Sequence, residues 1–231
     1  MAAKTAVQLR FGVRPGPGKL IAVEGLDGAG KTTVTKDLRD YIASLGIEVV
    51  STRIPSDKMR QSEFFQLLQQ QGRTDLVNPL AFEVEYMVDR IQHCRSFIEP
   101  ALRGGSWVLT DRYALSSIGS LLLRLPELKE VAMSALSGDA WFPDLCRHLV
   151  KPDLCLLLHA APQTTVSRLN AREGEVDRNI DVSEYGFLQM FLCDVARANE
   201  MVFIDTDRPI GETLAECRSL IDRLCAVECD P

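Results

Sequence analysis

The segment from Gly25 to Thr32 constrains this chain more than any other feature. It reads Gly-Leu-Asp-Gly-Ala-Gly-Lys-Thr, a complete G-x-x-x-x-G-K-[ST] pattern between a strand-like run and a helix-like stretch. Its glycines allow backbone N–H groups to curl around phosphate oxygens, and the positive end of the following helix adds to the same site. Lys31 can place its charge on the β- and γ-phosphates, and the Thr32 hydroxyl can ligate Mg²⁺. The alternative is a glycine-rich turn without function, and the flanking strand and helix patterns argue against it.

The rest of the chain alternates short β-branched runs with longer helix-like segments. This pattern predicts an α/β fold, a five-stranded parallel sheet flanked by helices, and most strand candidates are continuous apolar runs, as expected where both faces are covered. Expected strands are 20–24, 47–52, 107–111, 154–159 and 201–205. Expected helices are 31–45, 57–71, 79–104, 116–123, 126–136, 162–172, 182–200 and 210–226. Because no repeat or linker interrupts them, we expect one domain at 19–231, after a basic tail at 1–18 whose alternating residues 7–13 could form a short edge strand.

Composition and charge exclude several classes of function. The chain has 231 residues, and 26 Lys+Arg against 32 Asp+Glu give a net charge of −6, which argues against non-specific nucleic-acid binding. No apolar run approaches the roughly 18–20 residues that would span a bilayer. The seven cysteines form no CxxC pair, so neither a disulfide framework nor a zinc cluster is expected. We expect a cytoplasmic protein without nucleic-acid or membrane partners, and the acid-free first 23 residues leave a mitochondrial location open.

A strand that ends in an acid would supply a second group near the metal, and the run from Trp107 to Asp111 has this form. An Asp in such a position also commonly caps a loop or helix, which is the structural alternative. Arg112 follows at the carboxyl end of the strand, where open α/β sheets bind ligands, and an arginine can hold a phosphate through two hydrogen bonds. We therefore assign Asp111 to the metal or phosphate side of the site and Arg112 to a phosphate.

Further arginines help to decide among GTPases, ATPases, transporter subunits and small-molecule kinases. Arginines near the carboxyl ends of strands, such as Arg53, suggest a second anionic substrate opposite the nucleotide. Arg168, Arg172 and Arg178 cluster after the fourth expected strand and indicate a basic lid at about 168–182. Such a lid could stabilise a phosphoryl group in flight and exclude water. A solvated helix face with ordinary i,i+4 charges is the alternative for this cluster.

Taken in order, the motifs of this chain resemble those of thymidylate kinases, which have the P-loop NTPase fold. They cover nearly the whole chain after residue 18, and their combined order and spacing are specific although some are individually loose. The motifs are Gly25 to Thr33, Arg53-Ile-Pro, the run from Tyr86 to His93, Asp111-Arg-Tyr, Pro152-Asp-Leu, the lid from Arg168 to Arg178, and Phe203-Ile-Asp. The mitochondrial-type UMP–CMP kinases are also similar, through Trp141-Phe-Pro-Asp-Leu and Lys151-Pro-Asp-Leu.

The resemblance implies an enzyme that transfers the γ-phosphoryl of ATP to a pyrimidine nucleoside 5′-monophosphate, with Mg²⁺ as cofactor. Asp27 matches the acid that contacts the sugar hydroxyl, and Arg53 and Arg112 match the arginines that hold the acceptor phosphate. The implied ATP-binding residues are Gly25, Leu26, Asp27, Gly28, Ala29, Gly30, Lys31, Thr32 and Thr33, and the implied metal ligands are Thr32 and Asp111. The implied catalytic residues are Lys31, Asp111 and, because the loop has no basic residue at 26–29, the lid arginines Arg172, Arg178 and Arg168.

Tyr86 and Arg90 match the base-stacking aromatic and the base-reading arginine of the family. Their spacing of four residues puts both on one face of a helix. An arginine can only donate hydrogen bonds, so Arg90 should favour a keto oxygen over an amino group, which argues for thymine or uracil over cytosine. Without the resemblance, a core aromatic and a surface ion pair would be the simpler interpretations.

The substrate side departs from the family pattern. Eight residues after Arg112 the family has an aromatic residue against the sugar and base, whereas this chain has Ser120. We assign Ser116, Ser117 and Ser120 to the acceptor site. Loss of the ring predicts relaxed selection for 2′-deoxyribose and for the thymine methyl group, so dUMP, UMP or a modified pyrimidine nucleotide joins dTMP as an expected acceptor.

Two other functions stay open from sequence alone. A deoxynucleoside kinase would share the P-loop and a basic lid, but it needs a carboxylate base near an uncharged hydroxyl. A nucleotide-binding module without catalysis would tolerate the altered base pocket. The resemblance also suggests a homodimer packed through the long helices, and the segment 125–150 either closes over the acceptor or buries a partner surface.

Overall fold

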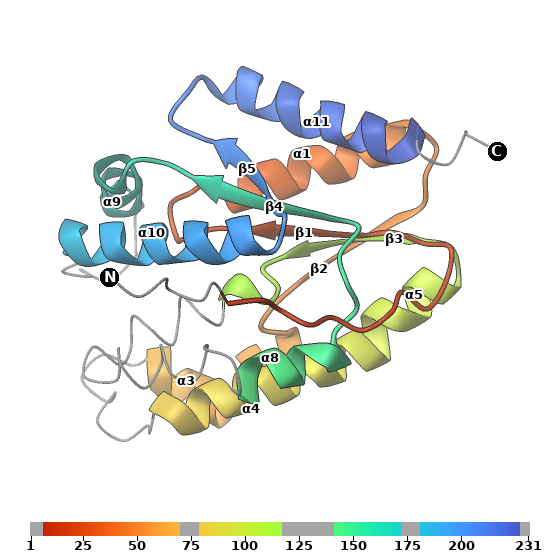
Figure 1. Ribbon diagram of the computed structural model, residues 1–231, viewed down its shortest axis with the longest axis horizontal. Helices are drawn as coiled ribbons and strands as arrows, with labels where there is room; N and C mark the ends of the chain where they lie inside the picture. Colours follow the sequence, from red (N-terminus) through yellow and green to blue (C-terminus); the bar gives the residue numbers. More distant parts are fainter. Residues whose placement is uncertain (1–6, 70–78, 117–140, 172–180, 227–231) are drawn as a thin grey trace.

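The computed structural model describes residues 7–69, 79–116, 141–171 and 181–226. Within them, five parallel strands form one sheet in the order β2-β3-β1-β4-β5, which matches the predicted sheet (Figure 1). The strands are β1 (Leu20–Glu24), β2 (Val49–Arg53), β3 (Trp107–Asp111), β4 (Leu154–His159) and β5 (Val202–Asp205). Since all five are parallel, their carboxyl ends lie along one edge of the sheet, with β1 in the middle.

The helices largely follow the predicted pattern, with two differences and two untested segments. They are α1 (Lys31–Ser44), α2 (Asp57–Arg60), α3 (Glu63–Gln69), α4 (Pro79–His93), α5 (Glu99–Arg103), α8 (Trp141–Leu145), α9 (Pro162–Asn170), α10 (Val182–Ala198) and α11 (Ile210–Ala226). The single helix expected at 57–71 is wrong: the Ser62 hydroxyl accepts the N–H of Phe65 at 3.2 Å, and α3 begins anew. Helix α8 was not predicted, and the helices expected at 116–123 and 126–136 lie outside the described residues except for residue 116, which is helical.

A π-helical turn, Cys94–Ile98, joins α4 to α5. The helix expected at 79–104 is therefore one continuous element of mixed geometry. Such turns insert one extra residue into the helical ladder and often occur at functional sites. Here the turn carries the buried residues Cys94 and Ile98 into the core.

Two cores cover the two faces of the sheet, and β1 supplies both. Ile21 and Val23 belong to the core formed with α1 and α11, whereas Leu20 and Ala22 belong to the core formed with α4, α5, α8 and α10. All five residues of β1 are buried. Figure 1 shows α1 and α11 on one side of the sheet and α4, α5 and α8 on the other. Because each fully buried aliphatic side chain contributes about 1.5–3 kcal/mol, this alternation fixes the central strand and the loop that follows it.

Residues 7–18, expected as a tail, lie against the second of these cores. The side chains of Val7 and Leu9 are buried, and Asn199 at the end of α10 accepts the Leu9 N–H at 2.7 Å. Gly12 forms one parallel bridge with Val150, so the possible edge strand is reduced to a single pair. The division into a tail and a domain stays a prediction, and the described part of this segment is packed.

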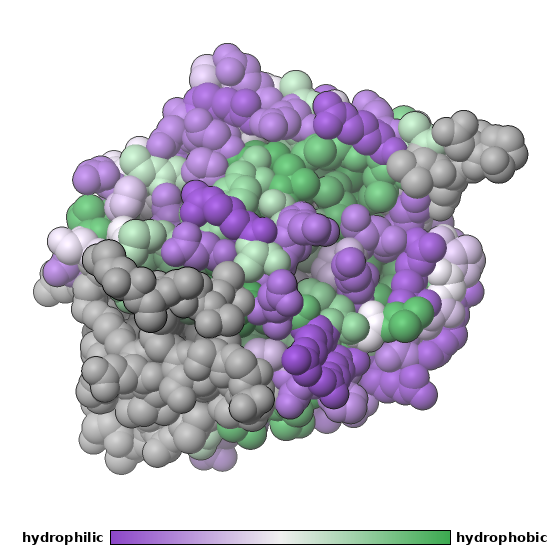
Figure 2. All heavy atoms as spheres, viewed as in Figure 1, coloured by the Kyte–Doolittle hydropathy of each residue, from purple (hydrophilic) through white to green (hydrophobic). Residues whose placement is uncertain are grey.

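In a space-filling view, apolar surface lies over the region of α11 and α1 and is surrounded by hydrophilic side chains (Figure 2). Among the described residues, no helix is both long enough and apolar enough to span a membrane.

Candidate functional site

The loop after β1 has the geometry of a phosphate cradle. Gly30 caps α1 with a φ of +91° and provides no side-chain hydrogen bond, and the first turn of α1 has no acid. The first N–H groups of a helix have no partner within the helix, and the helix dipole makes this end positive. A Cβ built on Gly30 would meet nothing within 4 Å, so open space adjoins these donors. A Cβ on Gly25 would lie 2.5 Å from the Leu158 carbonyl oxygen, so glycine lets the loop pass close to β4.

Lys31 is the first residue of α1, and its side chain reaches back to this loop. Only 6% of its surface is exposed, and its Nζ donates to the Leu26 carbonyl oxygen at 2.8 Å and lies 3.7 Å from Asp27 Oδ1. Burial, followed by the positive charge of Arg112, lowers the pKa of Lys31 to about 8, although Asp27 and Asp111 act in the opposite direction. The ammonium group is therefore held over the loop backbone, close to the space that a phosphate would occupy.

Arg112 is brought to the same loop by a sharp turn after β3. Its φ is +72°, a conformation that costs a non-glycine residue about 1–3 kcal/mol, and its N–H donates to the Val23 carbonyl oxygen at 2.9 Å. The guanidinium forms an ion pair with Asp27, and its Nη1 lies 3.4 Å from Ser116 Oγ. Burial alone would lower the pKa of Arg112, but the carboxylates around it outweigh burial and raise the pKa.

Glu24, the last residue of β1, was missed by the sequence analysis. Its buried carboxylate accepts the N–H groups of Tyr113 and Leu115 at 2.9 and 2.8 Å and the hydroxyl of Ser116. Burial raises the pKa of Glu24, and the Ser116 hydrogen bond and the charge of Arg90 partly oppose this rise. These bonds hold the turn after Arg112 against the start of the phosphate loop. A carboxylate directly before Gly25 was the only local signal, and its partners lie about 90 residues further along.

Asp111 occupies the position that a metal- or phosphate-side carboxylate would need. In the sheet register it pairs with Val23 on one side and with Arg53 on the other. Its Oδ1 is buried and has no hydrogen-bond partner among the described residues. Because buried polar atoms are rarely left unpaired, this oxygen is suited to a ligand.

Tyr86 and Arg90 lie on one face of α4, as their spacing predicts. The Arg90 guanidinium carbon lies 5.9 Å from the centroid of the Tyr86 ring. Arg90 is fully buried, and its Nε, Nη1 and Nη2 have no hydrogen-bond partner in the part of the chain that the structure describes. Such a group is costly to bury without an acceptor, so its placement points to a polar ligand.

Two further arginines end successive elements, Arg53 the strand β2 and Arg60 the helix α2. Arg53, at the end of β2, is exposed and pairs with Asp57 at 2.8 Å. Arg60, which the sequence analysis missed, is half-buried, and its Nε donates to the Pro55 carbonyl oxygen at 3.0 Å. Between Lys58 and Glu63 it reads as an ordinary surface charge, so only the fold reveals its position.

The lid arginines are described only in part. Arg168 lies on the opposite side of the phosphate loop, where its Nη2 donates to the Thr206 carbonyl oxygen at 2.7 Å and its Nη1 lies 3.5 Å from the Gly28 carbonyl oxygen. Thr206 follows β5, so Arg168 joins that loop to the phosphate cradle. The predicted site residues Arg172, Arg178, Ser117 and Ser120 lie outside the described residues.

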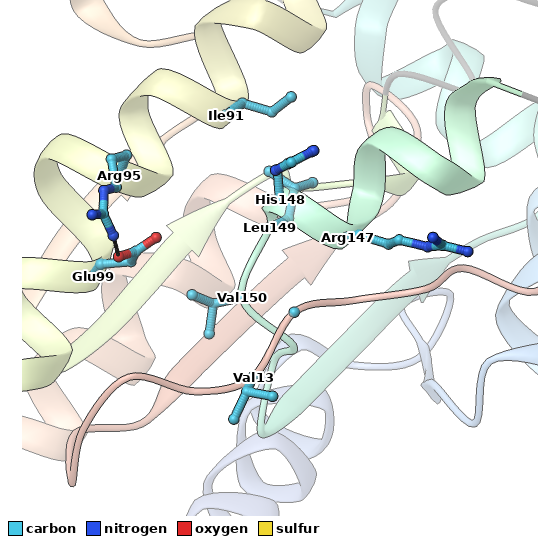
Figure 3. A pocket seen from close by; sticks show the side chains of 9 residues that line it. Val13, Ile91, Arg95, Glu99, Arg147, His148, Leu149 and Val150 are labelled. Atoms are coloured by element: carbon cyan, nitrogen blue, oxygen red, sulfur yellow. Dashed lines mark hydrogen bonds and ion pairs between the residues drawn. The ribbon is translucent and has the colours of Figure 1, made fainter.

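A cavity of about 430 Å³ lies apart from these residues, between the N-terminal segment and the π-helical turn (Figure 3). Arg95 and Glu99, which face each other across an ion pair of 2.6 Å, form one side of it. Its lining residues are Gly12, Val13, Ile91, Arg95, Glu99, Arg147, His148, Leu149 and Val150. None of them is a predicted nucleotide or acceptor residue.

The residues at the carboxyl edge of the sheet fit ATP and Mg²⁺. Open space adjoins the N–H groups beside Gly30, the exposed Thr32 supplies a hydroxyl, and Asp111 supplies a carboxylate oxygen that has no hydrogen-bond partner among the described residues. No group of three or more His, Cys, Asp or Glu side chains among the described residues could hold a metal ion. A Mg²⁺ ion here would therefore take most of its oxygen ligands from phosphates and water, as it commonly does.

Comparisons with known proteins agree with this geometry. The thymidylate kinase family model matches residues 23–217, a range that contains the phosphate loop, Arg90 and Asp111. The thymidylate kinase of Leifsonia xyli subsp. xyli is 30% identical over 213 residues, covering 89% of this chain and 95% of that protein. The thymidylate kinase of Shewanella amazonensis is 32% identical over 209 residues, covering 85% and 92%. The probable thymidylate kinase of Thermococcus gammatolerans is 30% identical over 174 residues, covering 72% and 78%. Their similarity along most of the sheet and its site means that this chain belongs to the thymidylate kinase family.

Proposed function

We propose that the chain transfers the γ-phosphoryl group of ATP to the 5′-phosphate of a pyrimidine nucleoside monophosphate, with dTMP as the principal acceptor. The observation that carries this proposal is the buried guanidinium of Arg90, which has no acceptor among the described residues and lies beside the Tyr86 ring. A thymine or uracil ring stacked on Tyr86 would bring a keto oxygen to these donors. Tyr86 and Arg90 would bind the base, and other arginines would bind the phosphate. An acceptor that carries both a base and a phosphate is a nucleotide.

In this proposal the described residues bind the two substrates and align the acceptor phosphate with the γ-phosphate of ATP. Arg53 and Arg112 hold the acceptor phosphate, and an acceptor oxygen attacks the γ-phosphorus while ADP leaves. In the structure Arg112 is paired with Asp27. Acceptor binding replaces this pair with an arginine–phosphate contact and releases the Asp27 carboxylate toward the sugar hydroxyl. Lys31 accompanies the β- and γ-phosphates, and no covalent enzyme intermediate is needed.

Thr32 and Asp111 would hold Mg²⁺ together with the phosphates. When bound, the ion neutralises charge on the phosphate oxygens. Arg172 and Arg178 would supply the lid charge for the transferring group, with Arg168 anchoring the start of the lid beside the Gly28 carbonyl. Residues 26–29 of the phosphate loop have no basic side chain. The additional positive charge that stabilises the transferring phosphoryl group therefore has to come from another segment of the chain.

A homodimer packed through the long helices, and a cytoplasmic location, are further proposals. Exposed apolar side chains support the dimer: Val84 and Val88 on α4 are 43% and 60% exposed, and Phe97 in the π-helical turn is 39% exposed. Residues spaced by four lie on one helix face, so these valines form part of one apolar stripe. Size-exclusion chromatography with light scattering tests the dimer directly.

The first experiment measures ADP release from Mg·ATP with dTMP, dUMP, UMP, dCMP and CMP, and with thymidine and uridine as unphosphorylated controls. We expect activity with dTMP and dUMP and much less with dCMP and CMP, because Arg90 can only donate. Comparable rates with UMP would support relaxed selection at Ser120. Turnover of thymidine without turnover of dTMP would contradict the proposal in favour of a nucleoside kinase, and ATP binding without any turnover would contradict it in favour of a non-catalytic module.

A further inference from the structure

The short helix α2 is fixed to α4, which carries the base-reading residues. The Ser56 hydroxyl caps α2 by accepting the Met59 N–H at 3.2 Å. The same hydroxyl donates to Asp89 of α4, and the Ser56 N–H donates to the second Asp89 oxygen at 2.8 Å. Arg60, the last residue of α2, is therefore held at a set place relative to Tyr86 and Arg90.

The guanidinium of Arg60 is oriented from two directions. Its Nε donates to the Pro55 carbonyl oxygen at 3.0 Å, and its central carbon lies 5.9 Å from the centroid of the Phe65 ring. The Phe65 ring is stacked with that of Tyr86, with centroids 6.4 Å apart. Since Arg90 in turn faces Tyr86, a continuous series of contacts links Arg60 through the two aromatic rings to Arg90.

Arg60 lies within the electrostatic reach of Arg53 and Arg112, the two arginines proposed to hold the acceptor phosphate. Burial, followed by the positive charge of Arg53, lowers the pKa of Arg60 from its ordinary value. Arg53 pairs with Asp57 and Arg112 pairs with Asp27. Tyr86 and Asp57 act in the opposite direction on the pKa of Arg60, and among the described residues Arg60 has no carboxylate partner within ion-pair distance. Like charges held together without full compensation favour the binding of an anion.

We propose that Arg60 is a third arginine of the acceptor-phosphate site and that its terminal amino groups bind the 5′-phosphate. With Nε committed to Pro55, Nη1 and Nη2 remain as donors for phosphate oxygens, which arginine binds through two hydrogen bonds. Arg90 binds the base beside Tyr86, and Arg60, which these contacts link to Arg90, binds the phosphate. This assignment rests on the proposed function and makes Arg60 a residue that discriminates a nucleotide from a nucleoside.

The test separates phosphate binding from packing on Phe65. The variant Arg60→Gln removes the charge, and Lys58→Gln removes an exposed charge from the same helix as a matched control. Calorimetry gives the dissociation constant for dTMP, and inhibition kinetics give the constant for thymidine, which lacks the phosphate. For Arg60→Gln we expect dTMP binding to weaken by about 10- to 100-fold, the effect of losing charge-assisted hydrogen bonds, with thymidine binding changed less than twofold. Lys58→Gln should leave both constants within twofold of the wild type.

Equal weakening of dTMP and thymidine binding by Arg60→Gln would overturn the assignment, because it would indicate a packing role only. Unchanged binding of both would overturn it as well. The variant Arg60→Lys keeps the charge and the aliphatic stem, so it should restore part of the dTMP affinity; an affinity no better than that of the Gln variant would contradict a role for the charge. If wild-type protein neither binds nor phosphorylates dTMP, the proposed function itself fails; if it does both and the Gln variant matches it, only the role of Arg60 fails.

Discussion

The buried charge of Arg90 should lower the stability of the protein while it favours acceptor binding. In the unliganded protein this guanidinium is fully buried, and none of its three nitrogens has a hydrogen-bond partner among the described residues. Each buried donor left unpaired lowers the free energy of unfolding by about 1–3 kcal/mol, and attraction to the charge of Glu24 offsets part of this loss. We therefore expect Arg90→Met, which keeps a long flexible apolar side chain, to increase the free energy of unfolding by about 2 kcal/mol.

The assay is thermal unfolding of the wild type and the variant with and without dTMP. For a chain of this size, 1 kcal/mol shifts the melting temperature by about 2–4 °C, so Arg90→Met should melt about 4–8 °C higher without ligand. The same variant should lose at least tenfold in kcat/KM for dTMP, because a hydrogen bond to a charged group contributes about 1.5–3 kcal/mol. Its melting temperature should also respond less to dTMP, because stabilisation by a ligand depends on affinity.

Arg95→Met is the matched control, because Arg95 lies on the following helical turn and forms an exposed ion pair with Glu99. Such pairs contribute about 0–1 kcal/mol, so its melting temperature and its dTMP kinetics should change little. A lower melting temperature for Arg90→Met would refute the reasoning, because it would mean that the guanidinium is well paired in the unliganded protein. Normal dTMP kinetics in that variant would remove Arg90 from the acceptor site.

Three further predictions concern Lys31 and His93. Lys31→Ala should reduce turnover at least 100-fold while circular dichroism and melting temperature stay close to those of the wild type; near-normal turnover would contradict the role of the loop. Because the pKa of Lys31 is lowered to about 8, kcat/KM for ATP should fall as pH rises through this value and the ammonium loses its charge, and Lys31→Arg should lack this alkaline fall. Burial lowers the pKa of His93, so below its ordinary value of 6.5 the unfolded chain takes up the proton first and the wild type loses stability. His93→Gln should therefore lose less unfolding free energy than the wild type between pH 7.5 and 5 in urea titrations, and equal losses would exclude His93 as the cause.

Local pattern was sufficient for the sheet and for the centre of the site. The strands β1, β3 and β4 were predicted with their observed bounds, because buried parallel strands are continuous apolar runs and need no partner to be recognised. The phosphate loop was equally accessible, since its glycines, Lys31 and Thr32 are contiguous. The family resemblance then predicted the pairing of Tyr86 with Arg90, and the matched relatives confirm the family.

The remaining features depend on contacts between distant segments. Glu24 binds residues about 90 positions away, and Arg60 has a set place relative to Tyr86 and Arg90 because α2 is fixed to α4 through Ser56. The break between α2 and α3 follows from one hydroxyl of Ser62, which a hydrophobic pattern does not register. No periodicity rule distinguishes such residues from surface charges, because their role is set by what folds against them.

The packed N-terminal segment has a consequence for how the protein should be prepared. Phe11 is stacked on Tyr113 with ring centroids 6.2 Å apart, and Tyr113 directly follows Arg112. The Gly12 N–H also donates to Leu149 at 2.7 Å. These residues precede the range 23–217 that the family model matches, so a clone trimmed to that range would discard part of the hydrophobic support beneath Arg112. Protein produced for these experiments should therefore retain residues 7–18 and carry any affinity tag at the other terminus.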